Sequence, residues 1–261
     1  MSLFSANLNF LFNEHDFMDR FEAAAKFGFR FVEFMFPYDY DIDQIREKIT
    51  QNKLKLVLIN LPAGDWAAGD RGIAADPDRV NEYRAAVPKA VEAAKKLGVD
   101  QVNCLVGKVA GSHSPVKIKE NLAANLTFTA DVFAEAGIRL LIEPINRYDI
   151  PGFVLNTTNQ VIEILDAIKK SNAFLQYDIY HAARENEDLD GVITKHIAKI
   201  GHVQIADNPG RNEPGTGKIP VKDLMKKLEI AGYKGYLGLE YKPSSKTEES
   251  LYWIKNIGRT L

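Results

Sequence analysis

Leu140-Leu-Ile-Glu143-Pro-Ile-Asn146 is the stretch that decides the fold, because in it an apolar run of strand length ends at an acidic residue and a proline follows directly. Proline offers no backbone N–H to a central strand, so it ends the strand here and leaves the carboxylate at the strand's carboxyl end. Similar apolar runs end in an oxygen-bearing side chain at Tyr177-Asp178, Val203-Gln204 and Leu239-Glu240. Four such strand ends predict one convergent site.

Alternating strand-like and helical segments continue in both directions from this stretch. The segment Leu54–Asn60 is almost continuously apolar, as expected of a strand buried on both faces. Strands are expected at 4–10, 29–34, 54–60, 101–105, 139–143, 174–178, 200–205 and 236–240, and helices at 17–27, 41–51, 79–97, 117–136, 159–169, 189–198, 221–231 and 248–257. Eight strand-helix units joined by short connections predict an α/β fold, a closed (β/α)₈ TIM barrel that forms one domain over residues 1–261. An open doubly wound sheet is the alternative.

Composition limits the classes of function. The 46% hydrophobic content supplies a large core, and a net charge of −2 does not favour nucleic acid as a partner. The single cysteine, Cys104, excludes an internal disulfide framework and is expected in the core. No apolar run approaches the roughly 18 residues of a membrane span, and no basic-then-apolar leader opens the chain. We therefore expect a cytoplasmic protein that does not enter a membrane; the oligomeric state is left open, a homo-oligomer included.

The strand ends Glu143, Asp178, Gln204 and Glu240 are neighbours around one rim of such a barrel. Three converging carboxylates repel one another unless a cation neutralises them or some stay protonated. Four oxygen donors suit a hard divalent ion such as Mg²⁺ or Mn²⁺ better than zinc. The alternative is that these acids cap strand ends and pair with nearby Arg or Lys.

Two histidines and two asparagines lie close to these strand ends. His181, three residues after Asp178, is a candidate substrate contact, whereas His202 shares a strand face with the rim residue two positions later and is expected deeper in the barrel. Asn60 and Asn103 end or nearly end their strands, so each could donate to a substrate hydroxyl or carbonyl. Buried structural amides are the alternative for both.

Four cationic side chains follow strand ends and could neutralise an anionic substrate. Lys242 is the best placed by sequence, because it comes two residues after Glu240 and directly before a proline. A solvated surface charge is the alternative for each of them. The four are Arg71, Lys108, Arg211 and Lys242.

A long loop of small residues, Leu61–Gly72, follows the third expected strand and carries Trp66. Loops of this length in compact domains are often functional. We therefore expect this loop to act as a lid that excludes water from the site.

Several motifs together resemble the hydroxypyruvate isomerase family of xylose-isomerase-like barrels, and they span nearly the whole chain. They are Phe34–Asp41, Asn60–Gly69, Glu143-Pro-Ile-Asn146, Gln176-Tyr-Asp-Ile-Tyr-His181, His202-Val-Gln-Ile-Ala-Asp207, Glu213-Pro-Gly-Thr-Gly217 and Gly238-Leu-Glu-Tyr-Lys-Pro243.

The resemblance implies an aldose-ketose isomerase that interconverts hydroxypyruvate and tartronate semialdehyde, a small 2-oxo acid and its hydroxy-aldehyde isomer. Glu143 and Glu240 are then the proton donor and acceptor, and they serve an enediol intermediate. Related metal-dependent epimerases use Glu, Asp, His and Glu as ligands; here Gln204 takes the third place. The alternatives are an isomerase of 2-oxo-tetronate or a sugar epimerase of the same superfamily, and, further off, a zinc endonuclease or a non-catalytic sugar-binding protein.

Overall fold

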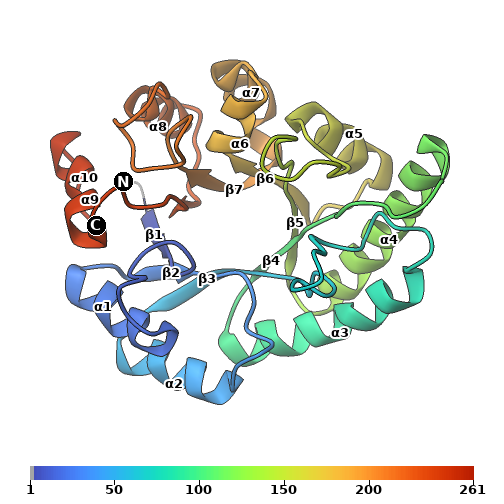
Figure 1. Cartoon of the computed structure of the whole chain (residues 1–261), viewed down its shortest axis with the longest axis horizontal. Coiled ribbons are helices and arrows are strands. Elements are labelled where there is room, and N and C mark those ends of the chain that lie inside the picture. The colour runs from blue at the N-terminus through green and yellow to red at the C-terminus, as the bar shows by residue number, and fades with distance from the viewer. Residues whose placement is uncertain (1–2) are drawn as a thin grey trace.

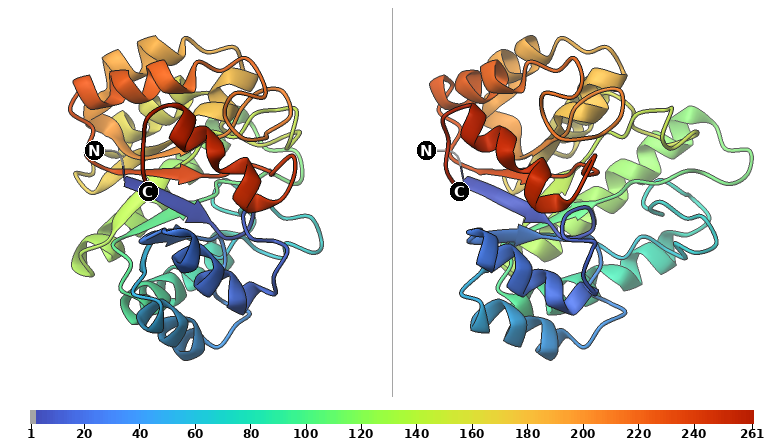
Figure 2. Two further views of the ribbon diagram at one scale, coloured as in Figure 1. Left: turned by 90° about the vertical axis from the view of Figure 1, so that its left-hand side faces the viewer. Right: turned by 60° about the vertical axis from the view of Figure 1, so that its left-hand side comes forward.

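The eight predicted strands form a closed parallel barrel in chain order, seen in a computed structural model that describes residues 3–261. The first and last strands pair in parallel, with Leu3 opposite Tyr236, and this pairing closes the sheet. Figure 2 shows these two strands side by side. The strands are β1 (Leu3–Asn7), β2 (Phe31–Glu33), β3 (Lys55–Asn60), β4 (Gln101–Cys104), β5 (Arg139–Ile142), β6 (Ala173–Asp178), β7 (Ile200–Ile205) and β8 (Tyr236–Leu239).

Helices surround the barrel and bury their apolar faces against it (Figure 1). The helices are α1 (Arg20–Phe27), α2 (Ile42–Gln51), α3 (Val80–Leu97), α4 (Pro115–Glu135), α5 (Thr158–Ile168), α6 (Ile179–Arg184), α7 (Leu189–His196), α8 (Val221–Ile230), α9 (Thr247–Ser250) and α10 (Tyr252–Asn256), with two 3₁₀ turns, η1 (Phe17–Asp19) and η2 (Ile197–Lys199). The (β/α)₈ prediction is thus confirmed, and the open doubly wound sheet is wrong because β8 pairs with β1.

Local sequence sets where these helices begin and end. The Asp41 carboxylate accepts hydrogen bonds from two backbone N–H groups in the first turn of α2, which would otherwise lack partners. A capping box formed by Thr157 and Gln160 opens α5. Gly98 ends α3 with a backbone φ of 70°, a left-handed conformation that glycine adopts without strain. These signals explain why the expected helix boundaries fall close to the observed ones.

Two expected elements differ from the structure, and one observed helix was not expected. The first strand stops at Asn7, because the following residues turn and the N–H of Leu11 bonds the carbonyl of Asn7. The closing helix is two short helices, α9 and α10, separated at Leu251. Helix α6 was not predicted, because it starts directly after β6 with no loop between them.

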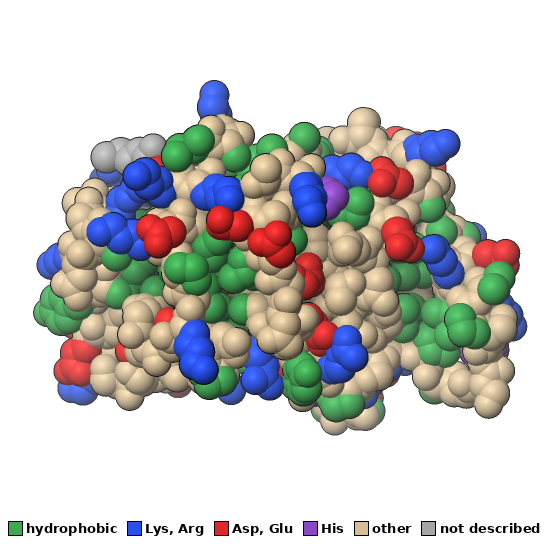
Figure 3. Space-filling view, turned by 90° about the horizontal axis from the view of Figure 1, so that it is seen from above, with side chains coloured by type: hydrophobic (Ala, Val, Ile, Leu, Met, Phe, Trp, Pro, Cys, Tyr) green, Lys and Arg blue, Asp and Glu red, His purple; other side chains and the backbone are tan. Residues whose placement is uncertain are grey.

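Charges of both signs are mixed on the molecular surface. On the face drawn in Figure 3, basic side chains lie among acidic ones rather than in a continuous basic patch. Across residues 3–261, none of the helices is both long and apolar enough to cross a membrane.

Candidate active site

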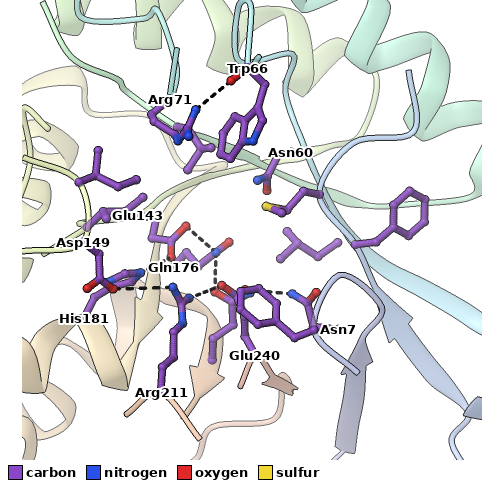
Figure 4. A pocket seen from close by; sticks show the side chains of 18 residues that line it. Asn7, Asn60, Trp66, Arg71, Glu143, Asp149, Gln176, His181, Arg211 and Glu240 are labelled. Atoms are coloured by element: carbon purple, nitrogen blue, oxygen red, sulfur yellow. Dashed lines mark hydrogen bonds and ion pairs between the residues drawn. The ribbon is translucent and has the colours of Figure 1, made fainter. Parts of the chain in front are cut away.

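A cavity of about 160 Å³ opens where β3, β5, β7 and β8 end, at the carboxyl-terminal face of the barrel (Figure 4). This is the face on which barrels of this kind carry their sites. Polar side chains from separate strand ends and loops point into it, among them Asn60, Glu143, Gln176, His181, Arg211 and Glu240. Of the four predicted strand-end residues, Glu143, Gln204 and Glu240 line the cavity, whereas Asp178 is not part of the lining that the structure describes.

Glu143 lies on the floor of this cavity and receives two amide donors. Its Oε2 accepts hydrogen bonds from Asn103 Nδ2 at 2.8 Å and from Gln176 Nε2 at 3.0 Å. The Gln176 amide also donates to Gln204 Oε1 at 2.7 Å, so one nitrogen bridges the ends of β5 and β7. Asn103 thus contacts Glu143 from within the barrel, and we expect it to orient that carboxylate rather than to contact substrate.

Glu240 forms the other half of the floor. It accepts hydrogen bonds from Asn7 Nδ2 at 2.9 Å and from Gln204 Nε2, and it is paired with Arg211. The side chain of Glu240 is 12% exposed, so it is open to the cavity, unlike the carboxylates beneath it.

Arg211 brings a positive charge between the carboxylates. Its guanidinium lies 3.3 Å from Asp178 Oδ2, pairs with Glu240, and stands over the ring of Tyr180 at 5.0 Å. Burial acts to lower the pKa of Arg211, but Glu240, Asp178 and Glu143 outweigh it and raise that pKa above its ordinary value. Asp178 and Glu240 therefore pair with an arginine, Arg211. Such pairing was the alternative that the sequence offered to a metal site.

Burial raises the pKa values of the carboxyl groups in this cluster. It raises the pKa of Glu143 well above its ordinary value, and repulsion from Glu240 and Asp178 adds to the effect. Burial raises the pKa of Glu240 to about 8, against the opposing attraction of Arg211. The pKa of Asp178 is also raised by burial. The floor can thus hold protons near neutral pH.

Asp178 and His181 are tied together by the first turn of α6. Asp178 Oδ1 accepts hydrogen bonds from the backbone N–H groups of Tyr180 and His181, so this carboxylate caps the helix. The side-chain oxygen of Asn146, Oδ1, accepts hydrogen bonds from two backbone N–H groups, so the amide presents its Nδ2 to His181. His181 Nδ1 accepts a hydrogen bond from that Nδ2 at 2.6 Å. The His181 hydrogen therefore sits on Nε2, 3.5 Å from Asp178 and 3.9 Å from Glu143.

Burial, with Arg211 and Arg184 nearby, lowers the pKa of His181 well below its ordinary value. The imidazole is therefore neutral and can donate one hydrogen bond into the cavity, which fits the predicted role of His181 as a substrate contact.

Two carboxylates and a histidine form a donor set that suits a divalent cation. One ligand atom each from Glu143, Asp178 and His181 lies within 4.8 Å of the others. Two buried oxygens of the same cluster, Asn103 Oδ1 and Gln176 Oε1, find no hydrogen-bond partner among residues 3–261. Crowded carboxylates gain most from a cation, so these residues fit a divalent metal ion.

Two predicted cationic substrate contacts, both lysines, lie outside the cavity. Lys242 is exposed. Strand β8 ends at Leu239, and the backbone N–H of Lys242 donates a hydrogen bond to the backbone carbonyl of Arg211 at 2.7 Å. The alternation of side chains along the strand therefore does not direct the lysine into the barrel. Lys108 is exposed as well, since Gly107 turns the chain with a φ of 91° and Lys108 then bridges to Phe153. Neither side chain belongs to the cavity lining that the structure describes.

Glu33 is a buried carboxylate beneath the floor that the strand-end pattern could have found but did not single out. Fully buried, it accepts hydrogen bonds from Ser5 Oγ at 2.5 Å and Gln204 Nε2 at 2.8 Å, and lies 3.0 Å from His202 Nε2. Burial acts to raise its pKa, but His202 and these donors hold the pKa below its ordinary value. His202 is also fully buried, as expected, and contacts Gln101 on the side away from Glu33.

Trp66 and Arg71, from the loop after β3, form the opposite wall of the cavity (Figure 4). The indole is 38% exposed and lies 5.1 Å from the Phe36 ring. The loop thus reaches the site, whereas its closure over a substrate stays a prediction.

Known proteins resemble this chain over nearly its whole length. Hydroxypyruvate isomerase from Escherichia coli is 50% identical over 254 residues, 97% of this chain and 98% of the relative. A 2-oxo-tetronate isomerase from Cupriavidus necator is 38% identical over 255 residues, 98% of each chain. A crystal structure described as an AP endonuclease, family 2, from Brucella melitensis is 38% identical and superposes with a TM-score of 0.95, covering 98% of this chain and 99% of its own.

The family model of the xylose isomerase-like TIM barrel matches residues 21–257. This match confirms the resemblance that the sequence motifs indicated, and it agrees with the closed eight-stranded barrel. The chain therefore belongs to the xylose isomerase-like TIM barrel family, and within it is similar to the hydroxypyruvate isomerases.

Proposed function

We propose that this protein is an isomerase that interconverts hydroxypyruvate and tartronate semialdehyde. The observation that carries the proposal is the pair Glu143 and Glu240, two carboxyl groups with raised pKa values on the floor of one cavity. Groups of this kind give and take protons efficiently near neutral pH. The 50% identity to a relative named hydroxypyruvate isomerase supports this substrate.

The chemistry requires two proton transfers to adjacent carbons. One carboxylate takes a proton from the CH₂OH carbon, the electron pair forms a carbon–carbon double bond, and the former carbonyl oxygen gains a proton. The resulting enediol then loses the proton of its other hydroxyl, which becomes the aldehyde, while the second carboxyl group protonates the adjacent carbon. We assign these two roles to Glu143 and Glu240. His181, through Nε2–H, and Asn60 are suited to donate hydrogen bonds to substrate oxygens.

We further propose that Glu143, Asp178, Gln204 and Glu240 hold a Mg²⁺ or Mn²⁺ ion. Such an ion, when bound, supplies positive charge that polarises a carbonyl and stabilises the oxygen that becomes negative. Arg211 contributes positive charge to the same carboxylates from the protein itself. Glu33 and Gln176 keep the Gln204 amide in one orientation, because they bond its nitrogen and its oxygen respectively.

A second candidate substrate is 2-oxo-tetronate, one carbon longer, which the name of the Cupriavidus necator relative favours. We propose a small acid rather than nucleic acid, although a similar solved structure is described as an endonuclease. A cavity of about 160 Å³ with a buried carboxylate floor suits a small molecule better than a phosphate backbone. A cytoplasmic location is part of the same proposal.

The test is a proton NMR assay of the purified protein in D₂O. Hydroxypyruvate and 2-oxo-tetronate are each supplied with EDTA, Mg²⁺ or Mn²⁺, and duplex DNA with an abasic site is assayed beside them. We expect product formation with deuterium incorporation, faster on hydroxypyruvate and dependent on the metal. Binding without deuterium exchange on either acid would instead indicate a non-catalytic binding protein, and cleavage of the DNA would indicate an endonuclease.

A further inference from the structure

Two arginines line the cavity, and only one of them is paired with carboxylates of the protein. Arg211 lies among Asp178, Glu240 and Asp149, so its charge already serves the protein's own carboxylates. Arg71 also lines the cavity, and it has no carboxylate partner among residues 3–261. A half-buried arginine without an acidic partner is free to pair with an anion from solution.

The surrounding loop holds the Arg71 guanidinium in one place. Its Nη1 donates to the backbone carbonyls of Trp66 at 3.1 Å and Asp70 at 2.6 Å, and its central carbon stands 4.0 Å from the centroid of the Trp66 ring. The adjacent carboxylate, Asp70, does not neutralise it, because Asp70 pairs with Arg79 at 2.8 Å instead. The loop therefore presents a fixed positive charge whose remaining N–H groups are free.

This charge faces the reactive floor from across the cavity. Figure 4 shows Arg71 and Trp66 on one side, Arg211 and Glu240 on the other, and Asn60 between them. Asn60 ends β3, and its side-chain amide makes no hydrogen bond within the described part of the chain, so it offers a further donor on this side. At the floor a substrate carboxylate would meet the carboxyl groups of Glu143 and Glu240 and an arginine, Arg211, that is already paired with acids, whereas at Arg71 it meets free donors.

We infer that Arg71 is the residue that binds the substrate carboxylate, with its guanidinium fixed by the Trp66 ring. The inference rests on the proposed function, since it assigns one end of a 2-oxo acid. A planar guanidinium donates two parallel hydrogen bonds to a carboxylate, which a lysine does not match. With its carboxylate held at Arg71, the substrate has its ketone and CH₂OH carbons directed toward Glu143 and Glu240. Arg71 thus selects acids over uncharged ketoses of similar size.

The experiment compares two non-reacting ligands that differ only in the carboxylate. Glycerate and glycerol are titrated by calorimetry into the wild type, Arg71→Met, Arg71→Lys and Lys242→Met, with Arg46→Met on the exposed face of α2 as the matched control. Turnover of hydroxypyruvate and of uncharged dihydroxyacetone is followed by NMR for the same proteins. Thermal unfolding of each variant verifies that it is folded.

We expect Arg71→Met to weaken glycerate binding about 10- to 100-fold, the usual effect of removing one charged hydrogen-bonding partner, and to leave glycerol binding unchanged. Arg71→Lys should recover part of the difference, and Arg46→Met should match the wild type. A folded Arg71→Met protein that keeps the wild-type preference for glycerate would overturn the inference, as would loss of that preference in Lys242→Met alone. Wild-type binding of glycerate without turnover of hydroxypyruvate would refute the proposed function, while the effect of Arg71→Met on glycerate binding would still decide the Arg71 assignment.

Discussion

Glu143 and Glu240 owe their raised pKa values first to burial, and this is what suits a carboxyl group to proton transfer. We expect Glu143→Gln and Glu240→Gln each to lower turnover of hydroxypyruvate about 10²- to 10⁴-fold, because an amide neither gives nor takes the proton. Both variants should stay folded, since Gln keeps the shape of Glu. The NMR assay measures turnover, with exposed Glu248→Gln as the control, and wild-type rates in both variants would refute the assignment.

Glu33 is a fully buried carboxylate beneath the site, where it accepts a hydrogen bond from Gln204. Glu33→Gln leaves His202 without its carboxylate partner in a fully buried position. We expect the free energy of unfolding in urea to fall by about 3 to 5 kcal/mol, the usual cost of breaking a buried pair. Exposed Glu22→Gln, which removes a surface pair with Lys26, should change it little. An unchanged midpoint for Glu33→Gln would show that Glu33 does not stabilise the barrel.

Among the elements, the loop Leu61–Gly72 is the one expected to move. A β-bridge between Gly72 and Val106 holds the end of the loop, and Gly72 there has a φ of 105°, which favours glycine. Trp66, in the middle of the loop, is 38% exposed. If the loop closes as a lid, substrate binding should lower the quenching of Trp66 fluorescence by acrylamide.

The second tryptophan, Trp253, is buried in α10 and should contribute little to the quenching. The variant Trp66→Phe should abolish the substrate-dependent change and identify its source. Equal quenching with and without a bound acid would mean that the loop is already in its final position.

For the whole molecule, the buried carboxyl cluster predicts how stability depends on pH. The pKa of Glu240 is about 8 in the folded chain against an ordinary 4.5, so between these values the folded state holds more protons than the unfolded state. Its contribution therefore makes the free energy of unfolding fall as pH rises through this window. His181 acts in the opposite direction below its ordinary pKa of 6.5, because its own pKa is lowered.

Between pH 6.5 and 8, comparing the wild type with Glu240→Gln separates the carboxyl contribution from that of the histidines, which both proteins share. In EDTA, we expect the unfolding free energy of the wild type to fall more steeply there than that of Glu240→Gln, as measured in urea. Added Mg²⁺ should reduce the slope if it binds the carboxylates. Identical slopes for the two proteins would contradict the raised pKa of Glu240.

The sequence alone predicted a parallel α/β fold and the residues at its rim. Eight apolar runs alternating with helices favoured a closed barrel over an open doubly wound sheet, and in such a barrel the strand ends at Glu143, Asp178, Gln204 and Glu240 lie on one side. Because apolar periodicity and helix caps are local properties, they can be read from neighbouring residues. The family motifs led to the same fold and to the same pair of glutamates.

Only the tertiary structure decided which charges belong to the site. Lys242 and Lys108 follow strand ends as Arg71 does, yet the chain turns away at both lysines, while the loop after β3 brings Arg71 back over the cavity. Likewise, Glu33 contacts the site from beneath, because it accepts a hydrogen bond from Gln204, a residue distant from it in sequence. The direction of a loop, and the partner that a buried charge finds, depend on contacts between remote segments, and these form only when the barrel closes.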